Sequence, residues 1–381
     1  MNRFSRNLAT VLLAVVCAAA TVPADAADEP IDMQRAKELL QKQRSGGQLS
    51  DDERAYLDRA KEIRAQRRNG ANPNTRREGG RNANVGKSSV GIEPLCCMAA
   101  DADYRGEDGG LYGGGRNTPP DSLMAAFAKQ VPKVRPLNKK GEPDEEGKIV
   151  LLSIGMSNTT QEFSAFQRSI DTDPRKAKSV VLVDGAQGGQ SASEWTVRNA
   201  ERTWSRLDAR LVAAGVSPEQ VQVLWVKQAE LKPLPDEMDN ARVLHEHLVE
   251  ILNRAQARFP NLRLAYLSSR TYGGYSGRHP EPESFATAFS VRWLIRDQIA
   301  GKPELSWDPE SGEVKSPLVM WGPYFWADGV RPRASDGLVW NREDFVADGT
   351  HPSESGRAKV AKMLTDFFTA DPTAKGWFVG Q

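Results

Sequence analysis

The sequence predicts a parallel α/β fold for the region after residue 147, on the basis of two observations. Short apolar runs alternate there with longer segments of helical periodicity, which is the pattern of β-α-β units. The runs are apolar along nearly their whole length, which is typical of strands covered by helices on both faces. Because open sheets of this kind bind ligands at the carboxyl ends of their strands, the residues that follow each strand are the candidates for a functional site.

Each element of this region is placed by its apolar pattern. The strands are expected at 149–154, 180–183, 221–226, 262–267 and 318–321, and the helices at about 193–214, 236–258, 283–300 and 354–369. Strands joined by helices of this length pair in parallel through right-handed crossovers. Residues 148–381 are therefore expected to form one domain around a parallel sheet of about five strands.

The first 26 residues have the features of an export signal. Arg3 and Arg6 give a basic start, and residues 8–20 form a short apolar run. Ala24-Asp25-Ala26 then provides a cleavage site. The apolar run is shorter than a membrane-spanning helix requires, and no later apolar segment reaches about 18 residues. We expect an exported, periplasmic or secreted protein without an integral membrane segment. Lipid attachment at Cys17 is disfavoured, because Val16 stands where lipoprotein signals need a small residue.

Three segments are expected between this signal and the α/β domain. Residues 27–68 have the charged, periodic pattern of a helical hairpin, with a capping signal at 50–53. Residues 69–90 read as a flexible basic linker, and residues 91–147 as a Gly- and Pro-rich wrapping segment. Basic side chains dominate from Arg64 to Lys87, so contact with a surface polyanion is one hypothesis, and a merely solvated tether is the other.

The overall charge offers no field that would attract nucleic acid. Lys and Arg number 51 against 50 Asp and Glu, which gives a formal net charge of +1. After the signal only Cys96 and Cys97 remain, and two adjacent cysteines without a nearby histidine make neither a disulfide framework nor a zinc site. No metal and no organic cofactor is expected.

Candidate catalytic groups follow the first three strands. Ser157 lies in a turn after the first strand, where a nucleophile would be exposed, although Gly-x-Ser turns are also common without catalysis. Gly189 belongs to a glycine-rich turn after the second strand, whose backbone N–H groups would hold an oxyanion or merely allow a tight turn. Gln228 follows the third strand and offers an amide donor that carries no charge, with a capping or loop role as the alternative.

The strongest local signal is the sequence Asp348-Gly349-Thr350-His351 just before the last helix. Three residues of separation let the carboxylate of Asp348 reach one imidazole nitrogen of His351, so that the other nitrogen can accept a proton from a serine. A capping aspartate beside an incidental surface histidine is the alternative. His279 is the weaker candidate for the base, since we find no acid at a comparable spacing from it.

The order of these groups resembles that of the SGNH (GDSL-like) hydrolase superfamily, over residues 148–369. The resemblance implies a flavodoxin-like three-layer α/β/α sandwich and ester hydrolysis through an acyl-enzyme. It implies Ser157 as nucleophile, Gly189 as the second-block glycine, and Asp348 with His351 as the final pair. Two positions depart from the family: Met156 replaces the usual Asp of Gly-Asp-Ser, and Gln228 replaces the third-block Asn. The role of Gln228 as an oxyanion donor is therefore a hypothesis. Arg270 and Tyr272 are the alternatives for stabilising charge or binding substrate.

Aromatic residues before Asp348 suggest a carbohydrate substrate. Trp321, Tyr324 and Trp326 lie there, and aromatic rings beside a hydrolytic site suit stacking on sugar rings, with core packing as the alternative. Within the superfamily the chain looks most similar to secreted carbohydrate O-acetylesterases. The leading hypothesis is an esterase that removes O-acyl, mainly O-acetyl, groups from a carbohydrate. The alternatives are a lipid or thioester hydrolase of the same fold and a catalytically silent carbohydrate- or cell-wall-binding protein.

Overall fold

The computed structural model describes residues 89–380 except 198 and 199, together with a few residues between 35 and 60. By its contacts the chain divides into two units, residues 1–80 and residues 81–381. The expected export signal and the basic stretch from Arg64 to Lys87 lie outside the described residues. In the first unit, Ser50 and Glu53 form a capping box: the Glu53 N–H donates to Ser50 Oγ (3.2 Å), and the Ser50 N–H donates to Glu53 Oε2 (3.0 Å).

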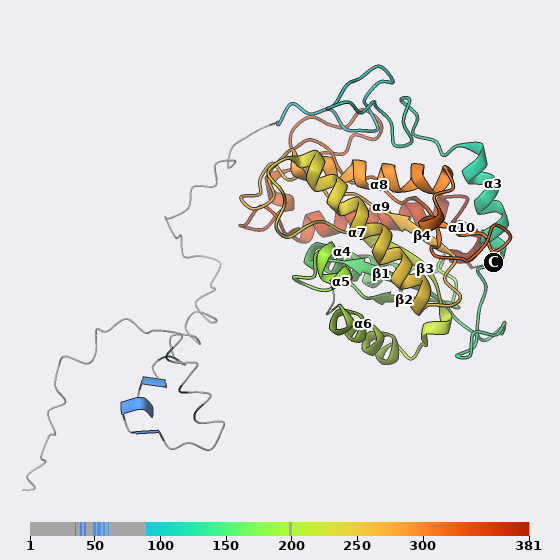
Figure 1. Ribbon diagram of the computed structural model, residues 1–381, viewed down its shortest axis with the longest axis horizontal. Helices are drawn as coiled ribbons and strands as arrows, with labels where there is room; N and C mark the ends of the chain where they lie inside the picture. The colour runs from blue at the N-terminus through green and yellow to red at the C-terminus, as the bar shows by residue number, and fades with distance from the viewer. Residues whose placement is uncertain are drawn as a thin grey trace, which may run out of the picture. The chain divides into compact units, whose positions relative to one another are not determined.

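The second unit is built on a five-stranded parallel sheet with helices on both sides (Figure 1). The strands are β1 (Ile149–Gly155), β2 (Val180–Asp184), β3 (Val221–Lys227), β4 (Leu264–Leu267) and β5 (Leu318–Trp321). Their order across the sheet is β2-β1-β3-β4-β5, which is the order of flavodoxin-like doubly wound sheets. The predicted α/β class and all five predicted strands are confirmed, with ends that differ by at most two residues.

Helices cover the two faces of the sheet. They are α3 (Asp121–Gln130), α4 (Ser157–Ile170), α5 (Ala192–Thr196), α6 (Glu201–Ala213), α7 (Glu237–Arg258), α8 (Glu283–Ile299), α9 (Glu354–Ala370) and α10 (Lys375–Phe378). Those from α4 to α8 connect the strands, α3 precedes β1, and α9 and α10 follow β5. The connection through α4 runs across the sheet in the opposite direction to those through α7 and α8. Right-handed crossovers therefore place α4 on one face and α7 and α8 on the other. Accordingly, α4 packs against α9, and α7 packs against α8 and α5.

Three helical features differ from the sequence-based expectation. The helix expected at about 193–214 is two helices, α5 and α6, because the backbone turns out of helical geometry at Val197 (ψ 163°). The helix α4 was not predicted, although Phe163, Phe166 and Ile170 give it a buried apolar stripe. The segment 91–147 contains α3, whose Leu123 and Phe127 are buried in the core, so this segment is partly regular structure.

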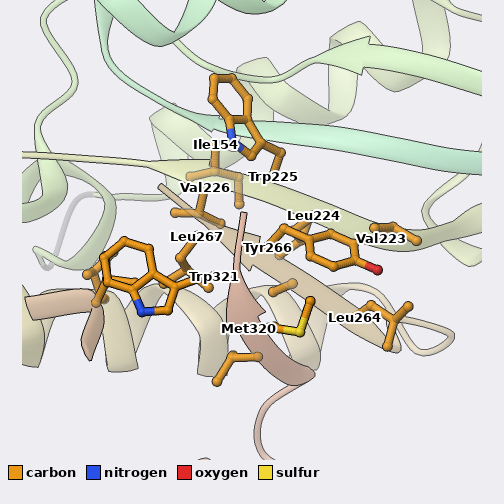
Figure 2. Packing of buried hydrophobic residues seen from close by; sticks show 14 of the residues in the cluster. Ile154, Val223, Leu224, Trp225, Val226, Leu264, Tyr266, Leu267, Met320 and Trp321 are labelled. Atoms are coloured by element: carbon orange, nitrogen blue, oxygen red, sulfur yellow. The ribbon is translucent and has the colours of Figure 1, made fainter. Parts of the chain in front are cut away.

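Large side chains from the central strands fill the core. Trp225 of β3 stacks on Phe163 of α4, with ring centroids 5.7 Å apart, and Tyr266 of β4 packs edge-on against Phe368 of α9. Figure 2 shows how side chains from neighbouring strands lie against one another in this cluster. The sheet is thereby a rigid base, and its carboxyl edge positions the residues of the candidate site.

Candidate active site

Ser157 is placed by the junction between β1 and α4. Gly155 ends the strand, and a Cβ on it would lie 2.4 Å from the Lys227 carbonyl oxygen and 2.3 Å from Thr159 Oγ1, so only glycine fits. Ser157 is the first residue of α4, where backbone N–H groups have no acceptor within the helix. The hydroxyl therefore stands at the positive end of a helix, at the carboxyl edge of the sheet.

Ser157, His351 and Asp348 form a continuous hydrogen-bonded relay. Ser157 Oγ lies 2.8 Å from His351 Nε2, and His351 Nδ1 lies 2.6 Å from Asp348 Oδ2. The second carboxylate oxygen of Asp348 accepts the backbone N–H groups of Thr350 (2.8 Å) and His351 (2.9 Å). The predicted Ser, His and Asp residues are thus brought together in the order that general-base activation of a serine requires.

The electrostatics of the relay favour an ionised Asp348. Partial burial works to raise the pKa of its carboxyl, but the hydrogen bonds from His351 and Thr350 outweigh burial and hold the pKa below its usual value. An ionised Asp348 accepts from His351 Nδ1, which leaves Nε2 free to accept the hydroxyl proton of Ser157.

The loop that carries Asp348 and His351 is fixed by contacts that the sequence reasoning missed. Gly349 has φ +65°, and a Cβ there would come within 1.8 Å of the Tyr275 carbonyl oxygen, so this turn requires glycine. Asn158 of α4 donates its side-chain N–H to the Thr350 carbonyl (2.8 Å). The hydroxyls of Ser276 and Thr350 are 2.6 Å apart. Asn158 directly follows Ser157, so one helix end positions both the Ser157 hydroxyl and the loop of His351.

The turn after β2 brings backbone donors to Ser157. A Cβ built on Gly188 would lie 3.9 Å from Ser157 Cβ, which makes Gly188 the glycine that faces Ser157. Gly189 is next to it, with φ +76° and open space where a side chain would be. Neither glycine N–H donates to a group in the described part of the chain, so both are available to an oxyanion. Sequence alone offers no way to choose between two adjacent glycines, and only Gly189 was singled out.

Gln228 lies beside this turn. Its side-chain nitrogen is 3.4 Å from the Gln190 carbonyl oxygen, and its side-chain oxygen is 3.4 Å from the Ala229 nitrogen. The residue is only 4% exposed. The long bond to Gln190 engages at most one N–H of the amide, so the other remains available as a donor at the edge that carries Ser157.

We expect Gln228→Ala to lower kcat on p-nitrophenyl acetate by roughly 10²–10³ while KM changes little, because a hydrogen bond to an oxyanion strengthens as charge develops. Gln228→Asn should recover part of the rate, since it keeps the amide but withdraws it by one methylene. The control is Gln190→Ala, which removes a neighbouring amide whose oxygen accepts from Thr203. A raised KM at unchanged kcat would instead assign Gln228 to ground-state binding, and no effect on either constant would favour Arg270 or Tyr272.

A buried ion pair lies beneath the site. Lys227 Nζ lies 2.7 and 2.6 Å from the two carboxylate oxygens of Glu162, with side-chain exposures of 4% and 0%. Burial raises the pKa of Glu162 and lowers that of Lys227, and the attraction between them opposes both shifts. Glu162 belongs to the helix of Ser157, and Lys227 directly precedes Gln228, so the pair ties α4 to the end of β3.

Lys227→Met should lower the free energy of unfolding by about 3–5 kcal/mol, because it leaves Glu162 buried without its partner. The double variant Glu162→Leu with Lys227→Met removes both charges and should be distinctly more stable than the single variant. Urea unfolding at pH 7 measures both. A loss below about 1 kcal/mol in the single variant would show that the loss of Lys227 does not leave Glu162 with an uncompensated buried charge.

The four aromatic residues that were predicted to bind substrate are all buried. Trp321, Tyr324 and Trp326 are 3%, 6% and 0% exposed. Their polar atoms bond to protein groups, as when Trp321 donates its indole N–H to the Leu111 carbonyl (2.8 Å). Tyr272 is 1% exposed, and its hydroxyl is enclosed. The structure therefore places these four aromatic residues in the packed interior, and does not present their rings at the surface beside the triad.

The other histidines are engaged with acids away from Ser157. His279 Nδ1 lies 3.0 Å from Glu283 Oε1, and the pair is buried. This acid is four residues along the chain, a partner that the sequence reasoning overlooked. His247 Nδ1 lies 2.8 Å from Glu230 Oε1, and that hydrogen bond raises the pKa of His247. Of the four histidines, only His351 contacts the candidate nucleophile.

Two features are absent from the described residues. No group of three or more His, Cys, Asp or Glu side chains is arranged to hold a metal ion within that part of the chain. No helix in the portion of the chain that the structure describes is both long and apolar enough to cross a membrane.

Comparison with known proteins adds little to this geometry. No family model and no curated protein matches the chain. Among solved structures, a protein from Arabidopsis thaliana is similar over 55% of this chain and 67% of the Arabidopsis chain. The sequence identity is 13% and the TM-score is 0.33.

Proposed function

We propose that the chain is a serine esterase of the SGNH kind, which hydrolyses O-acyl esters on carbohydrates through an acyl-enzyme. The observation that carries the proposal is the relay itself, with 2.8 Å from Ser157 Oγ to His351 Nε2 and 2.6 Å from His351 Nδ1 to Asp348. A turn with a purely structural role does not require a hydroxyl, an imidazole and a carboxylate hydrogen-bonded in series, with the hydroxyl at a helix N-terminus.

The proposed reaction proceeds in two halves. His351 accepts the Ser157 proton as Oγ attacks the ester carbonyl, and Asp348 stabilises the imidazolium that forms. The N–H groups of Ser157, Gly188 and Gly189 and the Gln228 amide are the proposed donors to the oxyanion. His351 returns the proton to the leaving sugar hydroxyl, and water then releases the acyl group from Ser157 by the same route.

The exposure of the relay supports a large substrate. The side chains of His351 and Asp348 retain 33% and 47% of their surface. An open site of this kind admits an ester on the outside of a polymer, whereas a long acyl chain needs a deep apolar pocket. An acylated carbohydrate outside the cytoplasm, reached by export, is therefore the favoured substrate class, and a lipid or thioester remains the alternative within this fold.

Release of acetate from O-acetylated polysaccharide, compared with hydrolysis of p-nitrophenyl palmitate and of acetyl-coenzyme A, tests this proposal. We expect acetate release from the polysaccharide at kcat/KM at least about tenfold above that for the other two esters. Preference for the palmitate or the thioester would replace the carbohydrate by the alternative substrate. No turnover of any ester would favour the catalytically silent binding protein.

A further inference from the structure

Arg270 is a buried arginine in the loop that follows β4. It is 7% exposed, and no carboxylate among the described residues lies within ion-pair distance of its guanidinium. Its side-chain bond is from Nε to Ser284 Oγ (3.2 Å), and its two terminal nitrogens donate to no described protein group. Those nitrogens are also not among the enclosed atoms that lack a partner, so they retain contact with solvent.

Burial raises the pKa values of two acids, Glu162 and Glu281, and the positive charge of Arg270 opposes this rise. Both acids are hydrogen-bonded to other groups. Glu162 is held by Lys227 through both of its oxygens. Glu281 accepts the N–H groups of Gly273 (2.6 Å) and Phe285 (2.9 Å) and the indole N–H of Trp326 (2.7 Å). A buried guanidinium with open donors is unfavourable alone and is normally satisfied by an anion, most specifically by a planar carboxylate that accepts two parallel bonds.

Arg270 lies at the same edge of the sheet as the triad. Arg270 follows β4 in the sequence. Only β3 lies between β4 and β1 in the sheet, so the ends of β1 and β4 are about 10 Å apart. Arg270 interacts electrostatically with Glu162, in the helix of Ser157, and with Lys227, which precedes Gln228. Its loop also contacts the loop of His351, through Ser276 and Thr350 (2.6 Å).

We infer that Arg270 binds a carboxylate of the substrate, so that the preferred substrate is an O-acylated acidic sugar such as a uronic acid. The inference rests on the proposed esterase function and narrows it. The carboxylate is held beside the ester that Ser157 attacks, on the same sugar unit or the next, and no bond of the carboxylate changes in the reaction.

A matched pair of substrates tests this inference. Mono-O-acetyl methyl glucuronides and the corresponding glucosides differ in one carboxylate, and each set of positional isomers is assayed for acetate release. We expect wild-type kcat/KM to be about 10²-fold higher for the acid, and Arg270→Met to remove most of that ratio. Arg270→Lys should keep part of it, because lysine retains the charge without the fork. The control is Arg278→Met, an exposed arginine of the same loop, which should leave the ratio and both rates unchanged.

The outcomes separate this inference from the esterase proposal. If Arg270→Met lowers both rates and keeps the ratio, the arginine acts at the reacting carbonyl and the carboxylate assignment is overturned. Equal rates for both sugars in the wild type, with ester hydrolysis intact, would overturn the inference and leave the esterase standing. If the variants do not fold, calorimetric titration of the wild type replaces them. The inference then requires the wild type to bind methyl glucuronide at least about tenfold more tightly than methyl glucoside. This requirement holds whether or not the protein hydrolyses an ester.

Discussion

Ser157→Ala is expected to lower kcat on p-nitrophenyl acetate by about 10⁴-fold or more, because it removes the atom that forms the acyl-enzyme. The Ser157 hydroxyl is half-buried at a strand edge, and its hydrogen bond is to His351, so the substitution should change the melting temperature by no more than about 2 °C. Activity and thermal unfolding are measured on the same preparation.

The serine control is Ser269→Ala. Ser269 follows β4 at the same edge of the sheet, is 1% exposed, and has an enclosed hydroxyl that bonds to none of the described residues. This variant should retain activity. If Ser157→Ala keeps a substantial rate while Ser269→Ala loses it, the nucleophile lies after β4 and the assignment of Ser157 is wrong.

Asp348→Asn is expected to lower kcat by roughly 10⁴-fold while the loop keeps its conformation. An asparagine oxygen can still accept the N–H groups of Thr350 and His351, as Asp348 Oδ1 does now at 2.8 and 2.9 Å. The amide nitrogen then faces His351 Nδ1, which favours the tautomer with its proton on Nε2 and removes the acceptor for the Ser157 proton.

The matched control for this variant is Asp336→Asn. Asp336 is an exposed carboxylate that pairs with the buried Arg333, three residues apart as in the Asp348 and His351 pair. Its replacement should leave kcat unchanged. Equal activity of Asp348→Asn and the wild type across pH 6–9 would show that His351 is not the base that Ser157 uses.

The strands and the grouping of Ser157, His351 and Asp348 could be predicted from the sequence for a physical reason. Buried parallel strands need nearly continuous apolar runs, and these runs located β1 to β5. The pairing of Asp348 with His351 depends on a local turn, so its spacing is visible in the chain. The match of Ser157 to His351 was inferred from the order of the strands, and their 2.8 Å contact agrees with it.

Features that depend on contacts between distant segments were not accessible. Asn158 reads as an ordinary helix residue until the fold brings it to the Thr350 carbonyl. Lys227 reads as the polar end of a strand until it meets Glu162. For the aromatic residues before Asp348, the sequence shows that they are clustered but not that Trp326 is fully buried. In each case the partner or the burial is a property of the tertiary structure.

The central claim is that Ser157 is an activated nucleophile, and covalent labelling tests it most directly. The wild-type protein is incubated at neutral pH with a fluorophosphonate, and the modified residue is mapped by mass spectrometry of its peptides. We predict one adduct per chain, on Ser157, with labelling abolished in Ser157→Ala and strongly slowed in Asp348→Asn. An adduct on another serine, or no adduct on folded protein, would contradict the account.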